Sequence, residues 1–468
     1  MNRSLCFAPL LASVAILLAG PVHAATWYVL PGGSGDNSGT SWENAAPSIE
    51  NVIRDNASPG DTILVGNGTY YENINVDKEN LTIRSENGAE VTVIITPDIS
   101  KPVFEVKENN VTIAGLTIRG SDNAGIYCYG DSNNPTENCV IENNIIKNNR
   151  FGIWFEGTRS WTIRNNRIEN CTDSSIRAQA FNSGGIIENN SIRNCNRGIY
   201  LGGTTHDFTV DNNTIENCQL GIYFSNASGN TASDCKISLC NTGINVFLST
   251  VTILNCTVEN CGTGISLWSS SNCTLSGNTT ENCGAGGLLQ YSSNCILSGN
   301  FFANSGGNNF WIMGNRLSHF LHSIDNTNTV DAGPILYLTG MENLIINQEN
   351  RVGWLGLVNC DNVLAENLAV ECLLLAGSQN CRIDNTIAEN SPSPIYLFSS
   401  DNNSLSNLNL TGGSTGITLC NSNGNSISNC RIRGYSEYNI YLDNSHSNVI
   451  SNNTIRGGEM YGVCLTHS

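Results

Sequence analysis

Cysteine is the residue whose type and spacing most invite a chemical explanation in this sequence. The chain has 19 cysteines, and one column of them recurs about once in every 22 residues, usually directly after an Asn. Thiolates bind soft metals such as Cu(I), and thiols of exported proteins pair as disulfides. This column consists of Cys171, Cys195, Cys218, Cys240, Cys261 and Cys283.

The other metal-ligating residues are not arranged to support a metal centre. The sequence has no Cys-x-x-Cys pair and no Cys/His cluster with the spacing of a zinc site. His319 and His322 are three residues apart with Asp325 beyond, which is an incomplete ligand set. We therefore expect no cofactor, and copper or calcium binding has no ligand cluster to support it.

Acidic residues are not grouped in the way that sugar-cleaving sites require. Such sites use paired carboxylates, or a metal together with a base. Strings such as Asp-Asp, Asp-Pro-His and Gly-His-Gly are absent, and the acid–His pair His206-Asp207 recurs in no neighbouring repeat. We predict no catalytic residues, although carboxylates from distant repeats can still meet in space.

Short repeats must position all of these residues. A Gly or Ser opens a Gly-Ile-x-apolar unit in successive repeats, and each period holds three apolar pieces of three to five residues. Such pieces are too short for helices and alternate with a period of two, as strands do. The pattern predicts an all-β fold, a parallel β-helix with three short strands per coil of about 22 residues. The opening residues are Gly125, Gly152, Ser175, Gly198, Gly221, Gly243, Gly264 and Gly286.

The alternation assigns inward and outward faces to the first strand of each coil. Inward Ile residues should stack at about 4.8 Å, the spacing of neighbouring strands. One outward residue lies between two inward ones, and several of these are aromatic, which suits the stacking of sugar rings. The alternative is that aromatic residues simply stabilise neighbouring strands. The outward column is Tyr127, Trp154, Arg177, Tyr200 and Tyr223, continued later by Tyr396, Thr418 and Tyr441.

One thiol per coil fits a small buried apolar residue that fills a fixed corner of each coil. Disulfides between adjacent coils remain the alternative, because the spacing is within range while parallel Cβ vectors hinder the required torsion. Columns of Asn accompany the thiols, and Asn tolerates left-handed backbone at turns. Among the Asn-x-Ser/Thr sequons, Asn67 and Asn226 in turns are the glycosylation candidates.

The repeats resemble those of right-handed parallel β-helix proteins of the pectin-lyase-like class. The segment "HFLHSIDNTNTVDAGPILYLTG", followed by "GWLGLVNCDNVLAENLAV", resembles the NosD-like subgroup, a periplasmic copper-processing and carbohydrate-binding type found in bacteria and in archaeal surface proteins. The resemblance implies a right-handed, single-stranded parallel β-helix. It implies little about function, because solenoids carry many activities.

The ends and the middle of the chain depart from the repeat. Residues 1–24 have a basic start and a short apolar run, which predicts a cleaved signal peptide. Residues 25–72 should form an N-terminal cap with one amphipathic helix, with Ser41 near its N-cap and Ile49, Val52 and Ile53 on its apolar side. Coils are expected over 73–307, an irregular insert over 308–350, and further coils over 351–468, whose last coil has no cap and could meet a partner.

The charge and the signal peptide limit the function. The net charge is −18 and the pI about 4.7, and no basic stripe suits nucleic acid. No segment after the signal peptide is apolar enough to span a membrane. We predict an exported protein, secreted, at the cell surface or periplasmic, that binds carbohydrate or a surface polymer without catalysis. The alternatives are a polysaccharide lyase, hydrolase or epimerase with a dispersed acidic site, and a NosD-type factor for copper-enzyme maturation.

Overall fold

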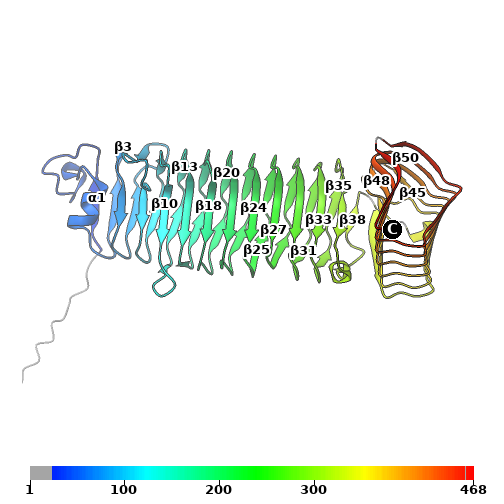
Figure 1. The fold of residues 1–468 in the computed structure, drawn as a ribbon. Helices are drawn as coiled ribbons and strands as arrows, with labels where there is room; N and C mark the ends of the chain where they lie inside the picture. The colour runs from blue at the N-terminus through cyan, green and yellow to red at the C-terminus, as the bar shows by residue number, and fades with distance from the viewer. Residues whose placement is uncertain (1–23, 332, 351, 390, 459) are drawn as a thin grey trace, which may run out of the picture.

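The chain forms two stacks of β coils joined near residue 332 (Figure 1). The computed structural model describes residues 24–331, 333–350, 352–389, 391–458 and 460–468. The predicted signal peptide lies outside these residues apart from Ala24. Nearly all strand pairs are parallel, so the predicted parallel β-helix is confirmed.

The first array has three parallel sheets. Sheet A contains β1 (Thr26–Val29), β2 (Thr62–Val65), β5 (Thr82–Ser85), β8 (Thr112–Ala114), β12 (Val140–Glu142), β16 (Thr162–Arg164), β19 (Ile186–Glu188), β22 (Thr209–Asp211), β25 (Asn230–Ser233), β28 (Val251–Leu254), β31 (Thr274–Ser276), β34 (Ile296–Ser298) and β37 (Ser323–Ile324). Sheet B contains β3 (Gly68–Tyr71), β6 (Thr92–Ile95), β9 (Thr117–Arg119), β13 (Ile145–Lys147), β17 (Arg167–Glu169), β20 (Ser191–Arg193), β23 (Thr214–Glu216), β26 (Lys236–Ser238), β29 (Thr257–Glu259), β32 (Thr279–Glu281), β35 (Phe301–Ala303) and β38 (Thr329–Val330).

Sheet C is the third sheet of the first array and carries the predicted aromatic column. It contains β4 (Ile74–Val76), β7 (Phe104–Val106), β10 (Ala124–Tyr129), β14 (Phe151–Glu156), β18 (Ser174–Gln179), β21 (Arg197–Gly202), β24 (Leu220–Ser225), β27 (Thr242–Phe247), β30 (Thr263–Trp268), β33 (Ala285–Gln290) and β36 (Phe310–Met313). A small pair, β11 (Thr136–Glu137) and β15 (Thr158–Arg159), lies beside it in one corner.

The second array begins at β39 (Gly333–Thr339), which pairs antiparallel with β38. Its larger sheet, sheet E, continues with β41 (Trp354–Val358), β43 (Cys372–Ala376), β45 (Ile387–Glu389), β46 (Ile395–Phe398), β48 (Asn409–Cys420), β50 (Arg431–Asp443), β52 (Thr454–Gly458) and β53 (Tyr461–Thr466). Its smaller sheet contains β40 (Ile345–Ile346), β42 (Leu364–Glu366), β44 (Arg382–Asp384), β47 (Ser404–Ser406), β49 (Ser426–Ser428) and β51 (Val449–Ser451).

The register of sheet C follows the predicted repeat. Ile199 pairs with Ile222, which pairs with Ile244, and all three are fully buried. Gly precedes most of these Ile residues because the coils pack closely. A Cβ at Gly221 would lie 2.4 Å from the carbonyl oxygen of Gly243. At this rung the backbone approaches the next coil too closely for a larger residue, whereas the equivalent position in β18 is the buried Ser175.

The N-terminal cap differs from the single helix that the sequence suggested. Its helical part is a 3-10 turn η1 (Trp42–Asn44), a short α1 (Ile49–Asn51) and a π-helical turn η2 (Val52–Asn56). The cap residue is Ser48 and not Ser41, because the Ser48 hydroxyl accepts the Asn51 N–H at 3.1 Å. The predicted apolar side holds, since Ile49, Val52 and Ile53 are buried.

Residues 308–350 are not one irregular insert. The strands β36, β37 and β38 complete the last coil of the first array, with a 3-10 helix η3 (Leu317–Phe320) between the first two. The strands β39 and β40, with the 3-10 turn η4 (Gln348–Asn350), begin the second array. The change of stacking direction breaks the repeat in sequence without breaking the strand architecture.

The second array packs its side against the end of the first (Figure 1). In β41 and β43 every residue is buried, because one face fills the core of the second array while the other face joins the core of the first. The ring of Trp354 lies 5.3 Å from that of Phe310, and its Nε1 donates to the Phe310 carbonyl oxygen at 3.1 Å. The end of the first array is thus closed by the second.

Candidate functional site

The predicted aromatic column lies in register on the outer face of sheet C. Tyr127, Trp154, Arg177, Tyr200 and Tyr223 occupy consecutive rungs, and each is half-buried. The rings form two pairs, with centroids 4.7 Å apart for Tyr127 and Trp154 and 5.3 Å apart for Tyr200 and Tyr223. The sheet fixes the spacing of these pairs. This spacing is compatible both with the stacking of sugar rings on the column and with a role in stabilising neighbouring strands.

Arg177 joins the two aromatic pairs. Its guanidinium carbon lies 4.9 Å from the ring centre of Phe151, 5.4 Å from that of Trp154 and 5.7 Å from that of Tyr200. Cations are attracted to ring faces at such distances. Burial lowers the pKa of the Arg177 guanidinium, and Gln179 accepts a hydrogen bond from it. The column is thus one continuous stack from Tyr127 to Tyr223.

The stack stops at Tyr223, where the next two rungs carry the short side chains Asn245 and Ser266. Beside them lies Trp268, which is 46% exposed and was not among the predicted site residues. Trp268 follows Ser266 by two residues and therefore points to the same side of the strand. The alternation of inward and outward residues also predicts an outward side chain at Trp268. Only the outward position between the two inward residues was assigned from the sequence, so Trp268 was not included.

The thiols do not form disulfides in the described residues. Each thiol of the main column is buried at a corner and bonded to peptide groups. Cys195 Sγ donates to the Arg193 carbonyl oxygen at 3.2 Å and accepts the Cys171 N–H at 3.3 Å. Burial also raises the pKa of Cys128 and Cys372 well above the ordinary value for a thiol. These contacts are those expected of a structural ladder.

The two histidines of the segment after β36 are engaged locally. His322 Nδ1 accepts the Cys295 N–H at 3.2 Å, so its Nε2 donates to the His319 carbonyl oxygen at 2.9 Å. Burial lowers the pKa of His322 to about 4. With both ring nitrogens of His322 bonded to the backbone, this pair offers no metal corner.

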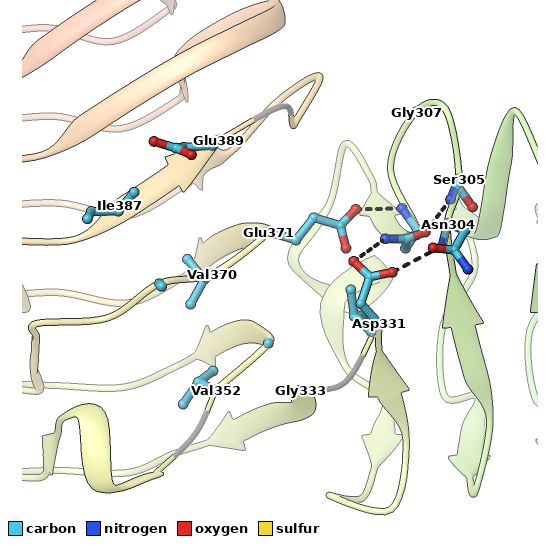
Figure 2. Close-up of a pocket in the computed structure, with 14 residues that line it drawn as sticks. Asn304, Ser305, Gly307, Asp331, Gly333, Val352, Val370, Glu371, Ile387 and Glu389 are labelled. Carbon is cyan, nitrogen blue, oxygen red and sulfur yellow. Dashed lines mark hydrogen bonds between the residues drawn. The ribbon is translucent and has the colours of Figure 1, made fainter. Parts of the chain in front are cut away.

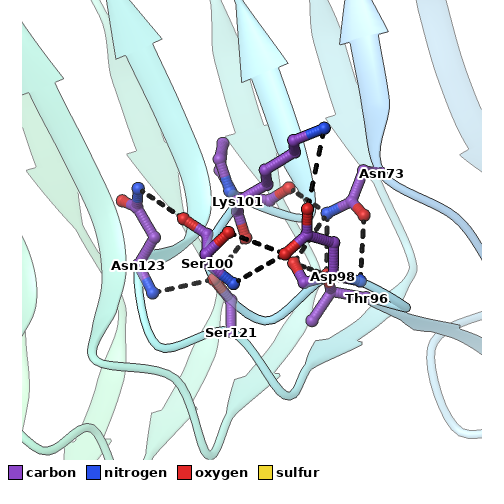
Figure 3. Close-up of polar contacts among 8 residues, drawn as sticks. Asn73, Thr96, Asp98, Ser100, Lys101, Ser121 and Asn123 are labelled. Atoms are coloured by element: carbon purple, nitrogen blue, oxygen red, sulfur yellow. Dashed lines mark hydrogen bonds and ion pairs between the residues drawn. The ribbon is translucent and has the colours of Figure 1, made fainter.

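In a polar network at one corner of the first array, a carboxylate accepts hydrogen bonds that hold a turn (Figure 3). Asp98 accepts the N–H and the hydroxyl of Ser100, at 3.1 and 2.7 Å, and pairs with Lys101 at 3.6 Å. The hydrogen bonds from Ser100 lower the pKa of Asp98. Asn73 Nδ2 donates to Thr96 Oγ1 at 2.7 Å in the same network. These contacts stabilise the turn, which accounts for the polar groups in it.

A cavity of about 700 Å³ lies where the two arrays meet (Figure 2). Glu371, which immediately precedes β43, reaches across it and accepts the backbone N–H of Asn309. Asn309 Nδ2 donates to Asp331 Oδ2 at 3.2 Å, and Asp331 Oδ1 accepts the Asn304 N–H at 3.0 Å. Two carboxylates 40 residues apart in the sequence thus bind the same residue, Glu371 its backbone N–H and Asp331 its side-chain amide, and the alternative of a dispersed acidic site needs carboxylates brought together in this way.

The two carboxylates differ in environment. Burial raises the pKa of Glu371 to about 8, and the charge of Asp331 acts in the same direction against the hydrogen bond from Asn309. Glu371 Oε2 is buried and has no hydrogen-bond partner among the described residues. Asp331 is exposed. A carboxyl group that keeps its proton near neutral pH beside an exposed carboxylate is a combination used for acid–base chemistry.

The fold and the register define a right-handed parallel β-helix protein. A profile described as "Right handed beta helix region" matches residues 103–250 and 220–350, which together cover more than half of the chain. The chain therefore belongs to the right-handed β-helix family. A profile described as "Periplasmic copper-binding protein (NosD)" matches residues 356–468. This match supports the NosD-like resemblance, because it overlaps the second of the two segments that carried it, residues 353–370, and begins after the first, His319–Gly340.

The residues present do not fit a copper centre. Within the described ranges, no group of three or more His, Cys, Asp and Glu side chains is arranged to hold a metal ion.

A curated relative is similar over part of the chain. It is a "Cell surface glycoprotein" of Methanothermus fervidus, 36% identical over 107 residues, which are 23% of this chain and 16% of the glycoprotein. The match thus spans about one sixth of that protein's length. In the part of the chain that the structure describes, no helix is long and apolar enough to cross a membrane.

Two solved structures show a low similarity to the chain. The structure titled "Crystal structure of pectate lyase Pel9A" is 14% identical, with a TM-score of 0.40, covering 66% of this chain and 78% of the other. The DFA-IIIase of Arthrobacter chlorophenolicus A6 is 11% identical, with a TM-score of 0.45, covering 70% of this chain and 97% of the other.

Proposed function

We propose that the protein is an exported β-helix protein of the cell surface or periplasm that binds carbohydrate on the outer face of sheet C without catalysing a reaction. The similarity of part of the chain to a cell surface glycoprotein and to the NosD family supports the location. Sugars present apolar C–H faces and hydroxyl groups, and aromatic rings beside polar side chains complement both.

The observation that carries the proposal is the stacked column from Tyr127 to Tyr223. Its rings are held by consecutive rungs of a rigid sheet, so little side-chain entropy is lost on binding. The ring face of Tyr223 turned away from Tyr200 adjoins the short side chain of Asn245. The net charge of −18 favours a neutral glycan, because a polyanion would be repelled.

The test is a glycan array with a variant that removes the aromatic column. Changing Trp154, Tyr200 and Tyr223 to Ala should abolish glycan binding and leave the circular dichroism spectrum unchanged. A matched control changes Tyr71 and Tyr461 to Ala, because both rings are more exposed than those of the column yet lie away from it. Binding that survives in the triple variant, or that disappears in the control, would overturn the proposal.

A second candidate function is a carbohydrate-active enzyme that works at the junction cavity. The observation that favours it is the pair formed by half-buried Glu371, whose Oε2 is buried, and exposed Asp331. The test incubates the protein with neutral and uronic-acid polysaccharides and measures reducing ends and product absorbance. Activity that disappears in Glu371→Gln would establish this candidate, and inactive wild-type protein on polysaccharides that it binds would exclude it.

A further inference from the structure

A second pocket lies on the outer face of sheet E, near the last coil. It has a volume of about 310 Å³ and is lined by Arg431, Arg433, Thr454 and Arg456. The three arginines are exposed and come from the adjacent strands β50 and β52. Three guanidinium groups thus converge on one small pocket of a chain whose net charge is −18.

The strand register places like charges side by side. Arg433 pairs directly with Arg456, while Arg431 pairs with Thr454. Like charges directly opposite each other on neighbouring strands are destabilising. The side chains alternate with the buried Ile432, so the sheet holds all three arginines on the same side. A bound anion would remove the repulsion that this register imposes.

Elsewhere in the chain, many arginines on a sheet face meet an acidic partner from the same or the next coil. Arg164 pairs with Glu142 at 2.7 Å, Arg193 with Glu169 at 2.6 Å, and Arg382 with Asp384 at 2.7 Å. No ion pair or hydrogen bond of the side chains of Arg431, Arg433 or Arg456 occurs among the described residues. The nearest acid of the same column, Glu389, lies two rungs away, beyond Thr411.

We propose that this pocket binds a tetrahedral oxyanion, a phosphate or sulfate group. The planar guanidinium group donates two parallel N–H bonds to such oxygens, and three groups can satisfy several of them at once. The Thr454 hydroxyl adds a neutral donor. The proposal is independent of glycan binding on sheet C, because the two surfaces share no residue.

The size of the pocket indicates whether the oxyanion can be part of a larger molecule. A volume of about 310 Å³ is at the lower end of the range for small-molecule sites, roughly 300–1,000 Å³. It therefore accommodates an oxyanion together with a group to which it is esterified, such as one sugar unit.

The experiment titrates the full protein with inorganic phosphate and sulfate by isothermal calorimetry, against sodium chloride of equal ionic strength. The wild type should bind both oxyanions. Arg433→Gln should weaken binding by roughly tenfold or more, since a charged hydrogen bond and a favourable charge are lost. Arg382→Gln is the matched control, because it removes one positive charge from the same array outside the pocket, and its affinity should be unchanged.

Two results would overturn the proposal: heats no larger than those with chloride, or an Arg433→Gln variant that binds as tightly as the wild type. Thermal unfolding in chloride shows that both variants are folded before titration. Glucose 6-phosphate and glucose 6-sulfate then distinguish the sources. Tighter binding than the inorganic ions assigns the site to an esterified sugar, equal or weaker binding assigns it to the free ion, and both support the oxyanion site.

Discussion

The two arrays use the same kind of coil but bury their outer faces differently. In the first array the outer face of sheet C is half-exposed and carries Tyr200 and Tyr223. In the second array part of the equivalent face, at β41, β43 and β46 of sheet E, is packed against the end of the first. Its Tyr396 is only 7% exposed, with the ring centroid 5.7 Å from that of Trp311, whereas Tyr441 on β50 is half-buried like Tyr200 and Tyr223. The same outward position is therefore a surface position in the first array and, at Tyr396, an interface position in the second.

The difference indicates that the second array is partly stabilised by the first. Its inner core is a separate cluster that includes Leu355, Leu357 and Leu373, whereas Trp354 and Leu374 on the other face belong to the core of the first array. In a solenoid, stability is close to a sum of coils and their interfaces. Loss of the interface between the two arrays should therefore lower the stability of the second array more than any other single change.

The largest effect is expected from Trp354→Ala. This change removes a fully buried ring that contacts Phe310 and leaves the Phe310 carbonyl oxygen without its Nε1 donor. Truncation of a buried Trp costs about 3–5 kcal/mol. Calorimetry should show the second array unfolding before the first. A single unfolding transition at the wild-type temperature would show that the second array does not depend on this interface. Tyr71→Ala is the control, because Tyr71 is 67% exposed, and it should change the unfolding midpoint little.

A smaller effect is expected within one array, at its internal ladder of Asn side chains. Asn190 is buried, accepts from Asn166 and donates both to the Ile163 carbonyl oxygen and to Asn213. Asn190→Ala removes these hydrogen bonds, at a cost of about 1–3 kcal/mol in total, because Asn166 Nδ2 and Asn213 Oδ1 each keep another partner. Denaturant unfolding should report the loss, while Thr214→Ala, an exposed position of the following coil, should be close to neutral.

The junction should also make stability depend on pH through Glu371. Because its pKa is raised to about 8 in the folded protein, and is about 4.3 in an unfolded chain, the folded state retains a proton that the unfolded state has lost. The stabilising contribution of Glu371 is therefore fully present below about pH 4. Above that pH the free energy of unfolding falls by about 1.4 kcal/mol per pH unit, up to the folded pKa.

Glu371→Gln keeps an acceptor for the Asn309 N–H and cannot ionise, so its stability should fall less steeply between pH 5 and pH 8. Denaturant midpoints across that range measure the slope. Glu389→Gln is the control, because this exposed carboxylate lines the same cavity. Equal slopes for wild type and Glu371→Gln would show that the junction imposes no such cost.

The sequence predicted what repeats from coil to coil. The stacked Ile residues, the outward position of Tyr200 and the corner Asn residues all depend on contacts between equivalent positions, which the period reveals. The side-on contact of the second array does not repeat, so nothing in the period indicated that Tyr396 is buried. The meeting of Glu371 with Asp331 depends on that contact too, because the residues belong to different arrays.

Arg433 and Arg456 mark an intermediate case. Their separation of one coil length in the sequence places them on adjacent rungs, so the pairing could have been predicted from the period. What the sequence did not reveal is that neither arginine has an acidic partner in the described part of the chain, because several arginines of the first array bind carboxylates on neighbouring coils.

The smallest effect concerns the left-handed corner that follows each strand of sheet B. Asn occupies this corner at Asn217 and Asn260, with φ of 52° and 55°, whereas the corresponding corner of the second array has Gly412 and Gly434. Leu239 departs from this pattern. Its φ is 56° and its side chain is 54% exposed, and left-handed backbone costs most residues about 1–2 kcal/mol.

Leu239→Asn should therefore stabilise the protein by about 1 kcal/mol, because Asn tolerates this conformation. The new amide would also extend the stack in which Asn217 Nδ2 donates to Asn194 Oδ1 at 2.9 Å. Thermal unfolding measures the gain, and the reverse change Asn217→Leu should lose a similar amount. A less stable Leu239→Asn variant would show that the exposed Leu makes a contribution that the preference for Asn at this corner does not include.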